Sequence, residues 1–364
     1  MTVGIAVASA AFSSCAAGDV AVPLGLPALH VPAANPQIPA KAALGERLFH
    51  DRRFSADGRI SCASCHQPER AFTDGCKVSL GNGRLAGVRN APTLLNAAYL
   101  SSQFWDGRRG TLEEQAREPF LSRNEHGLEQ PEELLRVIRS DADYVERFKT
   151  AFGIVAADIT FDHLAKALAA FERTLIAGDS AFDRYYYGGE KSALTPAAER
   201  GLALFSGRAR CAQCHVIGKE HALFTDNEFH TLSVGRKKIE QDLASTATRV
   251  AAMEPHAREQ VVLRRDDLSQ LGRFLVTLNP LDIGRFRTPS LRNVAQTAPY
   301  MHDGSIDTLE AAVELEIYYR GIEAGRPLIL TAREKADLVE FLEALSSPAA
   351  LPKAAAAPRA PECR

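Results

Sequence analysis

The chain has few of the features that mark membrane-spanning or nucleic-acid-binding proteins. None of its apolar runs is long enough to cross a bilayer, so the sequence predicts no transmembrane segment. Its formal net charge is -2 at pH 7, and the lack of a basic excess argues against a nucleic-acid partner. No sustained alternation of apolar and polar residues predicts a β-sheet. The 364 residues are enough for two domains, each with its own apolar core.

The N-terminal segment has no basic residue, although a secretory signal peptide normally begins with Lys or Arg. Residues 1–24 are otherwise rich in Ala, Val and Ser, so we interpret them as a signal segment whose start is missing or misassigned, with simple disorder as the alternative. The Pro-rich residues 23–39 predict a linker, and the Ala- and Pro-rich residues 348–364 predict a disordered tail. Three cysteines show no pairing pattern and receive no role: Cys15, Cys76 and Cys363.

The other cysteines form two copies of one pentapeptide, Cys62-Ala63-Ser64-Cys65-His66 and Cys211-Ala212-Gln213-Cys214-His215. C-x-x-C-H is the signature of covalent haem c attachment, because the two thiols add to the haem vinyl groups while the next imidazole reaches the iron. An isolated C-x-x-C is also typical of zinc sites and redox thiol pairs, but here a His follows each pair. The sequence therefore predicts two haem c groups. Because haem c is attached outside the bacterial cytoplasm, the motifs favour a periplasmic location.

Elsewhere apolar residues recur three and four apart, which is the spacing of helices. A short amphipathic helix precedes each haem peptide, at Gly45–Phe49 and Gly201–Phe205, with Gly and Phe in matching places. The charge-rich residues 237–265 are expected to form one or two exposed helices, either as a solvated face or as a docking element. The fold class is mostly α with long loops. Further helices are predicted over Pro131–Phe148, Phe161–Leu175, Pro196–Phe205 with Thr195 as its cap, Thr308–Tyr319 and Thr331–Leu345.

From about Leu44 to Leu345 the chain resembles the bacterial di-haem cytochrome c peroxidase and MauG family. The blocks that carry the resemblance, in order, are Ile60–His66, Arg89–Thr93, Trp105–Arg108, Leu112–Ala116, Phe286–Val294 and Thr297–Gly304. The resemblance implies two cytochrome c-like haem domains related by a pseudo-two-fold axis. These are an N-terminal peroxidatic domain over residues 25–188 and a C-terminal electron-transfer domain over residues 189–347, in an oxidoreductase that uses H2O2.

In that family the first haem, whose proximal ligand matches His66, is the five-coordinate site of peroxide cleavage. Glu125 matches a distal acid that moves protons during the cleavage, whereas from the residues alone it would be a solvated loop acid. Gln115 and Pro119 match residues that shape the same pocket. Peroxidases rest with a His from a mobile loop on this haem, but the corresponding loop here, Gly81-Asn82-Gly83, has none. The resemblance therefore implies a first haem that is open without reductive activation.

The resemblance to the family also implies two features of the region between the two haems. Trp105 is the only Trp in the chain and matches a residue that couples the two irons, whereas a lone Trp is otherwise usually a core or interface residue. One calcium ion is implied as well, with ligands matching Asn90, Thr297 and Pro299. Calcium prefers oxygen ligands, and backbone carbonyls leave no side-chain signature, so this ion rests on the resemblance only.

The second axial ligand of the second haem, opposite His215, stays open. It is Met in the peroxidases and Tyr in MauG, and the matching position here is Glu316. Tyr318 or Tyr319 would serve if the helix has slipped by a few residues; otherwise both are ordinary aromatics. An anionic oxygen ligand would stabilise ferric and higher oxidation states, and so would lower the potential of this haem.

These departures favour a MauG-like enzyme that uses H2O2 to drive both irons to high valence and then oxidises a protein partner through Trp105, as in the maturation of a tryptophan-derived cofactor. The alternative is a cytochrome c peroxidase that reduces H2O2 to water with electrons from a small cytochrome c or a cupredoxin. The third hypothesis is a pure electron-transfer cytochrome, in which both axial positions of each haem are occupied. The sequence does not fix the oligomeric state, and a homodimer is one alternative.

Overall fold

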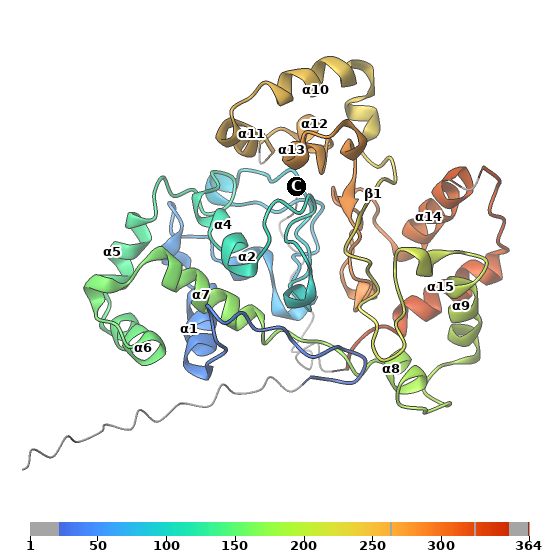
Figure 1. Ribbon diagram of the computed structural model, residues 1–364, viewed down its shortest axis with the longest axis horizontal. Coiled ribbons are helices and arrows are strands. Elements are labelled where there is room, and N and C mark those ends of the chain that lie inside the picture. Colours follow the sequence, from blue (N-terminus) through green and yellow to red (C-terminus); the bar gives the residue numbers. More distant parts are fainter. Residues whose placement is uncertain (1–21, 263, 324, 349–362, 364) are drawn as a thin grey trace, which may run out of the picture.

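The computed structural model describes residues 22–262, 264–323, 325–348 and 363, and most of the regular structure in them is helical (Figure 1). Two strands, β1 (Phe229–His230) and β2 (Phe286–Arg287), pair antiparallel in this described part. The helices are α1 Pro39–Phe49, α2 Cys62–Cys65, α3 Leu112–Gln115, α4 Glu118–Leu121, α5 Glu132–Ser140, α6 Ala142–Phe152, α7 Phe161–Glu172, α8 Ala181–Tyr186, α9 Pro196–Ser206, α10 Leu243–Ala251, α11 Pro255–Val262, α12 Asp266–Ser269, α13 Phe274–Thr277, α14 Leu309–Glu323 and α15 Ala332–Glu343.

Helices α1, α7, α9, α14 and α15 confirm the helices predicted from apolar spacing. The predicted cap is confirmed as well, because the Thr195 side chain accepts a hydrogen bond from the backbone N–H of Ala198 at the start of α9. The single helix predicted over residues 131–148 is wrong, since α5 and α6 are separate. Asp141 has an extended backbone there, and its carboxylate accepts from the N–H groups of Asp143 and Tyr144, so it ends one helix and begins the next.

Two crossed helix pairs organise the core, and they repeat one geometry. Helix α1 packs against α7, and α9 packs against α15. A Cβ at Gly45 in α1 would overlap the carbonyl oxygen of Ala167, and a Cβ at Gly201 in α9 would overlap that of Asp337. Only glycine allows each pair of helices to approach so closely. The Gly-x-x-x-Phe repeat of the sequence therefore corresponds to a structural repeat before each haem motif.

Each helix pair lies in its own large cluster of buried apolar side chains. The cluster around α1, α5, α6 and α7 includes Phe49 and Phe171, whose ring centroids are 5.2 Å apart. The cluster around α8, α9 and α15 includes Phe205 and Phe341, with centroids 5.0 Å apart. Figure 1 shows the first group of helices on the left and the second on the right. The predicted boundaries at residues 25–188 and 189–347 stay a prediction.

The Pro-rich segment after residue 22 is packed onto the body, although the sequence predicts a linker there. The carbonyl of Gly25 accepts a hydrogen bond of 2.6 Å from Arg292, whose guanidinium also pairs with the buried Asp183 at 2.8 Å. Farther along, the buried Asn35 donates to Glu113 at 2.7 Å. Most of the predicted signal segment, residues 1–21, lies outside the described residues.

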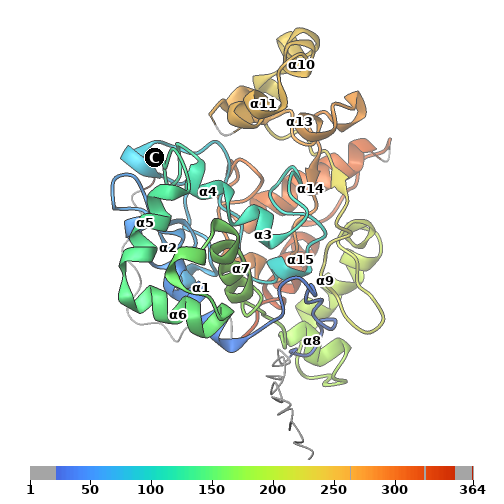
Figure 2. The same ribbon diagram turned by 60° about the vertical axis from the view of Figure 1, so that its left-hand side comes forward.

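The charge-rich insertion forms the predicted helices, α10 and α11, but it is more than a solvated face. With α12 and α13 it builds a small core of its own, and Figure 1 and Figure 2 both show these helices projecting beyond the rest of the molecule. Arg109, in the loop before α3, pairs with Glu259 of α11 at 3.0 Å and ties the insertion to the body. The buried members of this core are Ile239, Val250, Leu268, Leu271, Phe274 and Leu275.

Two cysteines left without a role by the sequence form a disulfide, Cys76–Cys363. They lie 287 residues apart, so no local spacing indicates the pair. The bond ties residue 363 to the loop that follows the first haem motif, although the predicted tail was expected to be free; residues 349–362 of that tail lie outside the described residues. In the described part of the chain, none of the helices combines the length and the apolar character that a bilayer crossing requires.

Candidate functional site

The two motif histidines are held in the same way. His66 follows the short helix α2, and its Nδ1 lies 3.0 Å from the carbonyl oxygen of Phe72. The Nδ1 of His215 lies 2.8 Å from the carbonyl oxygen of Phe224. With Nδ1–H donating to a carbonyl, Nε2 is left as the iron ligand. Burial lowers the pKa of His66 and lowers that of His215 to about 4, so both imidazoles are in the neutral form that binds iron.

A large cavity, here called the central cavity, extends from His215 to Trp105. Cys211 and Cys214 line it beside His215, so the three ligating and attaching groups of the second motif face one space. An apolar wall next to thiols and a neutral imidazole fits haem c. The apolar wall is formed by Phe205, Leu291, Leu309, Val313, Leu338 and Leu342.

Glu125 lies in the turn that follows α4. Its N–H donates to the carbonyl of Ser122 at 3.0 Å, and its own carbonyl accepts from the N–H of Asn82 at 2.7 Å. Burial raises the pKa of the Glu125 carboxyl to about 7; the charge of Arg108 opposes the rise and that of Glu118 adds to it. A carboxyl with a pKa near neutrality can both take up and release a proton at physiological pH.

The loop without a capping His packs directly onto this acid. A Cβ at Gly81 would overlap the carbonyl oxygen of Asn124 and lie 2.7 Å from the Cα of Glu125. A Cβ at Gly127, on the other side of Glu125, would meet the side chain of Asn82. The two loops therefore fit only because two glycines lack side chains, and their fit fixes the backbone of Glu125.

The pocket residues predicted from the resemblance lie next to this turn. Gln115 is the last residue of α3, and Pro119 is in the first turn of α4, where its carbonyl accepts from the N–H of His126 at 3.1 Å. His126 is buried, with Nδ1 2.9 Å from the carbonyl of Phe54 and Nε2 3.9 Å from Sγ of Cys62. Burial lowers the pKa of His126 to about 4, so its imidazole is neutral. This imidazole lies between the turn that contains Glu125 and the thiol of Cys62.

Trp105 is anchored at both its ring and its backbone. Its indole N–H donates to the carbonyl of Asn90 at 2.9 Å, and its own carbonyl accepts from the N–H of Arg287 at 2.8 Å. The next residue, Asp106, is fully buried between Arg89 at 2.7 Å and Arg108 at 3.2 Å. Burial opposes ionisation of Asp106, but the two guanidinium groups outweigh it and lower its pKa. The indole therefore has one fixed position in the central cavity.

The three residues predicted to bind calcium all line the central cavity. Asn90 donates through Nδ2 to the carbonyl of Cys76 at 2.9 Å, which directs its amide oxygen away from that bond. Among the described residues, no hydrogen-bond donor pairs with this oxygen or with the carbonyls of Thr297 and Pro299. An amide and two carbonyl oxygens of this kind fit a calcium ion, which takes oxygen ligands.

The three candidates for the second axial ligand opposite His215 lie in different places on α14. Glu316 lines the central cavity, on the same face as Val313 and Ile317. Tyr318 is 63% exposed, and neither it nor Tyr319 is among the residues that line the cavity. An ion pair of 3.5 Å joins Glu316 to Arg320, which also lines the cavity.

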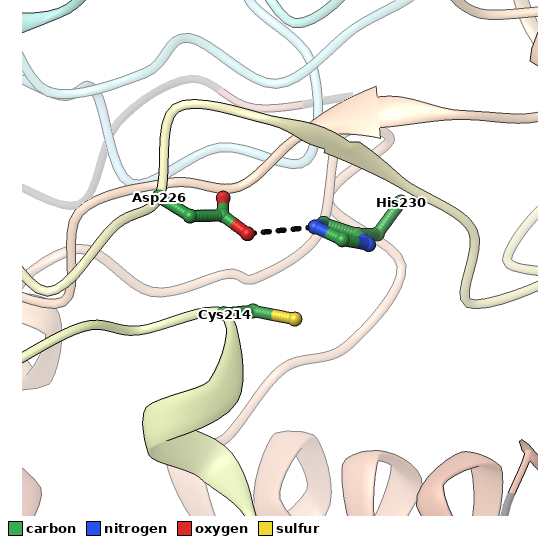
Figure 3. A group of neighbouring side chains, drawn as sticks. All are labelled: Cys214, Asp226 and His230. Carbon is green, nitrogen blue, oxygen red and sulfur yellow. Dashed lines mark hydrogen bonds and ion pairs between the residues drawn. The ribbon is translucent and has the colours of Figure 1, made fainter.

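A cysteine, an aspartate and a histidine lie close together, as Figure 3 shows, and two of them, Cys214 and His230, line the central cavity. His230 Nε2 lies 2.8 Å from a carboxylate oxygen of Asp226, and Cys214 points toward the pair. The three types could together hold a metal, but metal binding needs a cysteine thiolate and Cys214 belongs to the haem attachment motif. The Asp226–His230 pair therefore places a polar side chain, His230, on the wall of the central cavity next to Cys214.

The model of the di-haem cytochrome c peroxidase family matches residues 39–191. The chain is 37% identical to the cytochrome-c peroxidase IdrP1 of Pseudomonas sp. strain SCT, over 94% of this chain and 90% of the relative. It is 36% identical to the methylamine utilization protein MauG of Methylorubrum extorquens, over 88% and 82%. A crystal structure of a MauG-like protein associated with microbial copper homeostasis matches at 33% identity and a TM-score of 0.73, covering 91% of this chain and 96% of that one. The chain therefore belongs to the di-haem cytochrome c peroxidase and MauG family of peroxidase-type oxidoreductases.

Proposed function

We propose that this chain is a periplasmic enzyme that uses H2O2 to oxidise a protein partner, in the manner that the resemblance to MauG implies. Two covalently bound haems, on His66 and His215, would supply the redox chemistry. The chain's own residues would move the protons at Glu125 and conduct electrons from the partner past Trp105. The observation that carries the choice is Glu316, because the central cavity has this acid where a peroxidase has Met.

The distal side of the first haem supports the same choice. In the resting peroxidases a loop His closes this haem, whereas here the corresponding Gly81–Gly83 loop is packed against the backbone of Glu125. A loop fitted that closely holds the acid in place. The first haem would then be ready for peroxide without prior reduction of the second.

Glu316 is our proposed second axial ligand of the second haem. An anionic carboxylate would stabilise the ferric iron over the ferrous iron, and Arg320, at 3.5 Å, would hold the carboxylate in place. A haem with this ligand is a poor acceptor of electrons from a small cytochrome. Such a site would take electrons poorly from a donor while it is ferric, and would accept them from a protein substrate only after H2O2 has oxidised it further.

Replacing Glu316 with Met is expected to raise the midpoint potential of the second haem, because a neutral thioether favours ferrous iron. The measurement is a spectroscopic redox titration of the holoenzyme. Tyr318→Phe is the matched control, since this exposed ring lies on the same helix and away from the cavity. An unchanged potential in Glu316→Met, or a raised potential in Tyr318→Phe, would show that Glu316 is not a ligand of the iron.

Electron paramagnetic resonance on the diferric protein tests the function itself. One equivalent of H2O2 is added without any reductant. Loss of both the high-spin and the low-spin ferric signals is expected, because both irons would share the oxidising equivalents. Persistence of both signals until the second haem is reduced would instead identify a conventional peroxidase that waits for electrons.

The second candidate is therefore a cytochrome c peroxidase that takes electrons from a small cytochrome c or a cupredoxin. The 37% identity to a relative with that name favours it. It would use the same Glu125 at the first haem, and a high-potential second haem would support it. The Cys76–Cys363 disulfide fits the oxidising periplasm in both cases. Calcium at Asn90, Thr297 and Pro299 and a homodimer stay predictions.

A further inference from the structure

The repeat of crossed helices allows the two haem surroundings to be compared residue by residue. The Cβ position of Gly45 lies against the carbonyl of Ala167 and 2.8 Å from the Cβ of Phe171 in α7. The Cβ position of Gly201 lies against the carbonyl of Asp337 and 2.7 Å from the Cβ of Phe341 in α15. In each helix the Phe follows the residue with the contacting carbonyl at the same spacing, so Phe171 corresponds to Phe341. The residue after Phe171 therefore corresponds to the residue after Phe341.

That next residue differs in chemistry between the two helices. In α15 it is Leu342, which is 7% exposed and lines the central cavity beside His215. In α7 it is Glu172, which is just as buried at 6%. An acid thus occupies, in the first half of the repeat, the position that is a cavity-lining leucine in the second half. Its Oε2 is buried and has no hydrogen-bond partner among the described residues.

The charges around Glu172 do not neutralise it. Arg173, the residue that directly follows α7, pairs with Glu113 of α3 at 2.7 Å, and Lys41 of α1 donates to Asn35 and to a backbone carbonyl. Burial raises the pKa of Glu172 to about 8; Arg173 opposes this rise and Glu113 adds to it. The carboxyl is therefore mostly protonated at neutral pH.

Glu172 also interacts electrostatically with the first haem motif. Burial raises the pKa of the Cys62 thiol, and the charge of Glu172 raises it further, ahead of the contributions of Cys65 and Glu125. A charge in a poorly hydrated interior acts strongly on its neighbours. A change in the charge of the first haem, attached at Cys62, would therefore change the proton affinity of this carboxyl.

We propose that Glu172 is a proton-binding residue coupled to the first haem, which in alkaline solution binds a proton when that haem is reduced and releases it when the haem is oxidised. Reduction by one electron lowers the charge of the iron by one, and a proton from solvent converts the carboxylate into the neutral acid, so charge is conserved. The proposal rests on the presence of the first haem and not on the choice between peroxidase and protein oxidase. Its failure would leave the proposal for Glu316 and Trp105 untouched.

The test is the midpoint potential of the first haem in the holoenzyme, measured from about pH 6 to about pH 10. In the unmodified protein the potential is expected to fall as pH rises above about 8, where the ferric protein has lost the proton that the ferrous protein keeps. Glu172→Gln, of equal size, and Glu172→Leu, which copies Leu342, are each expected to lose this slope.

Glu125→Gln is the matched control, because it removes the other acid of high pKa and should keep the slope above about pH 8. Redox difference infrared spectra give a second measurement, since a band of a protonated carboxyl should vanish in Glu172→Gln and persist in Glu125→Gln. An unchanged slope in both Glu172 variants, or a slope that disappears only in Glu125→Gln, would overturn the proposal.

Discussion

Replacing Glu125 with Gln is expected to slow the reaction with H2O2 by about 10²–10⁴-fold at pH 7, the usual contribution of a placed acid or base. Peroxide must lose a proton when it binds, and its leaving oxygen must gain one. The amide of Gln can do neither, although it has the size and the hydrogen-bonding reach of the acid. Stopped-flow spectroscopy of the diferric holoenzyme measures this rate directly.

The pH dependence of the same reaction should identify the acting form of Glu125. Burial raises its pKa to about 7, so the carboxylate that accepts the first proton becomes populated as pH rises through about 7. The rate should therefore increase with pH through this region in the unmodified protein and lose this increase in Glu125→Gln. A Gln variant that keeps the same pH profile would place the proton acceptor elsewhere.

Glu129→Gln is the control for this substitution. Glu129 lies four residues farther along the same segment and is exposed, so its loss should leave the rate unchanged. Folding of Glu125→Gln is not expected to fail, because the contacts that fix this turn use its backbone: the N–H bound to Ser122 and the carbonyl bound to Asn82. A normal rate in Glu125→Gln would contradict the assigned role.

The features that the sequence predicts correctly are those whose signal is local. Each C-x-x-C-H pentapeptide brings its own ligand and attachment points, and the blocks around it are enough to identify the family. The helices before the motifs follow from apolar residues on one face, and Thr195 is a local cap. The single helix predicted over residues 131–148 is wrong, but the sequence does contain a signal for the break. Asp141, directly before Ala142, is of a residue type that caps the start of a helix.

The features that the sequence does not predict depend on contacts between distant segments. Cys76 and Cys363 meet across 287 residues, and nothing near either residue indicates the other. Glu172 looks like an ordinary helical acid until the crossing of α1 and α7 buries it. A signal for it did exist: the aligned Gly-x-x-x-Phe repeats could have been extended to the helices that they pack against, where Glu and Leu occupy matching places. The roles of the site residues stay predictions for the same reason, because they depend on cofactors that the folded chain surrounds.

The replacement of Trp105 with Phe is expected to uncouple the two haems. The indole is fixed by its bond of 2.9 Å to the carbonyl of Asn90, in a cavity that extends to His215. A phenyl ring fills much of the same space, but it lacks the N–H and gives up an electron less easily than indole. Oxidation of a protein partner should slow by at least about tenfold, which corresponds to a barrier higher by about 1.4 kcal/mol.

The spectroscopic consequence separates uncoupling from simple damage. After one equivalent of H2O2, the high-spin signal of the first haem should disappear in Trp105→Phe while the low-spin signal of the second persists. Tyr300→Phe is the matched control: this ring lines the same cavity and its hydroxyl donates one hydrogen bond, of 3.2 Å to the carbonyl of Val294, so the variant also loses one bond. Each loss costs about 0.5–1.5 kcal/mol of stability. If both signals vanish in Trp105→Phe as in the unmodified protein, electrons pass between the haems by another path and the indole serves only to pack the cavity.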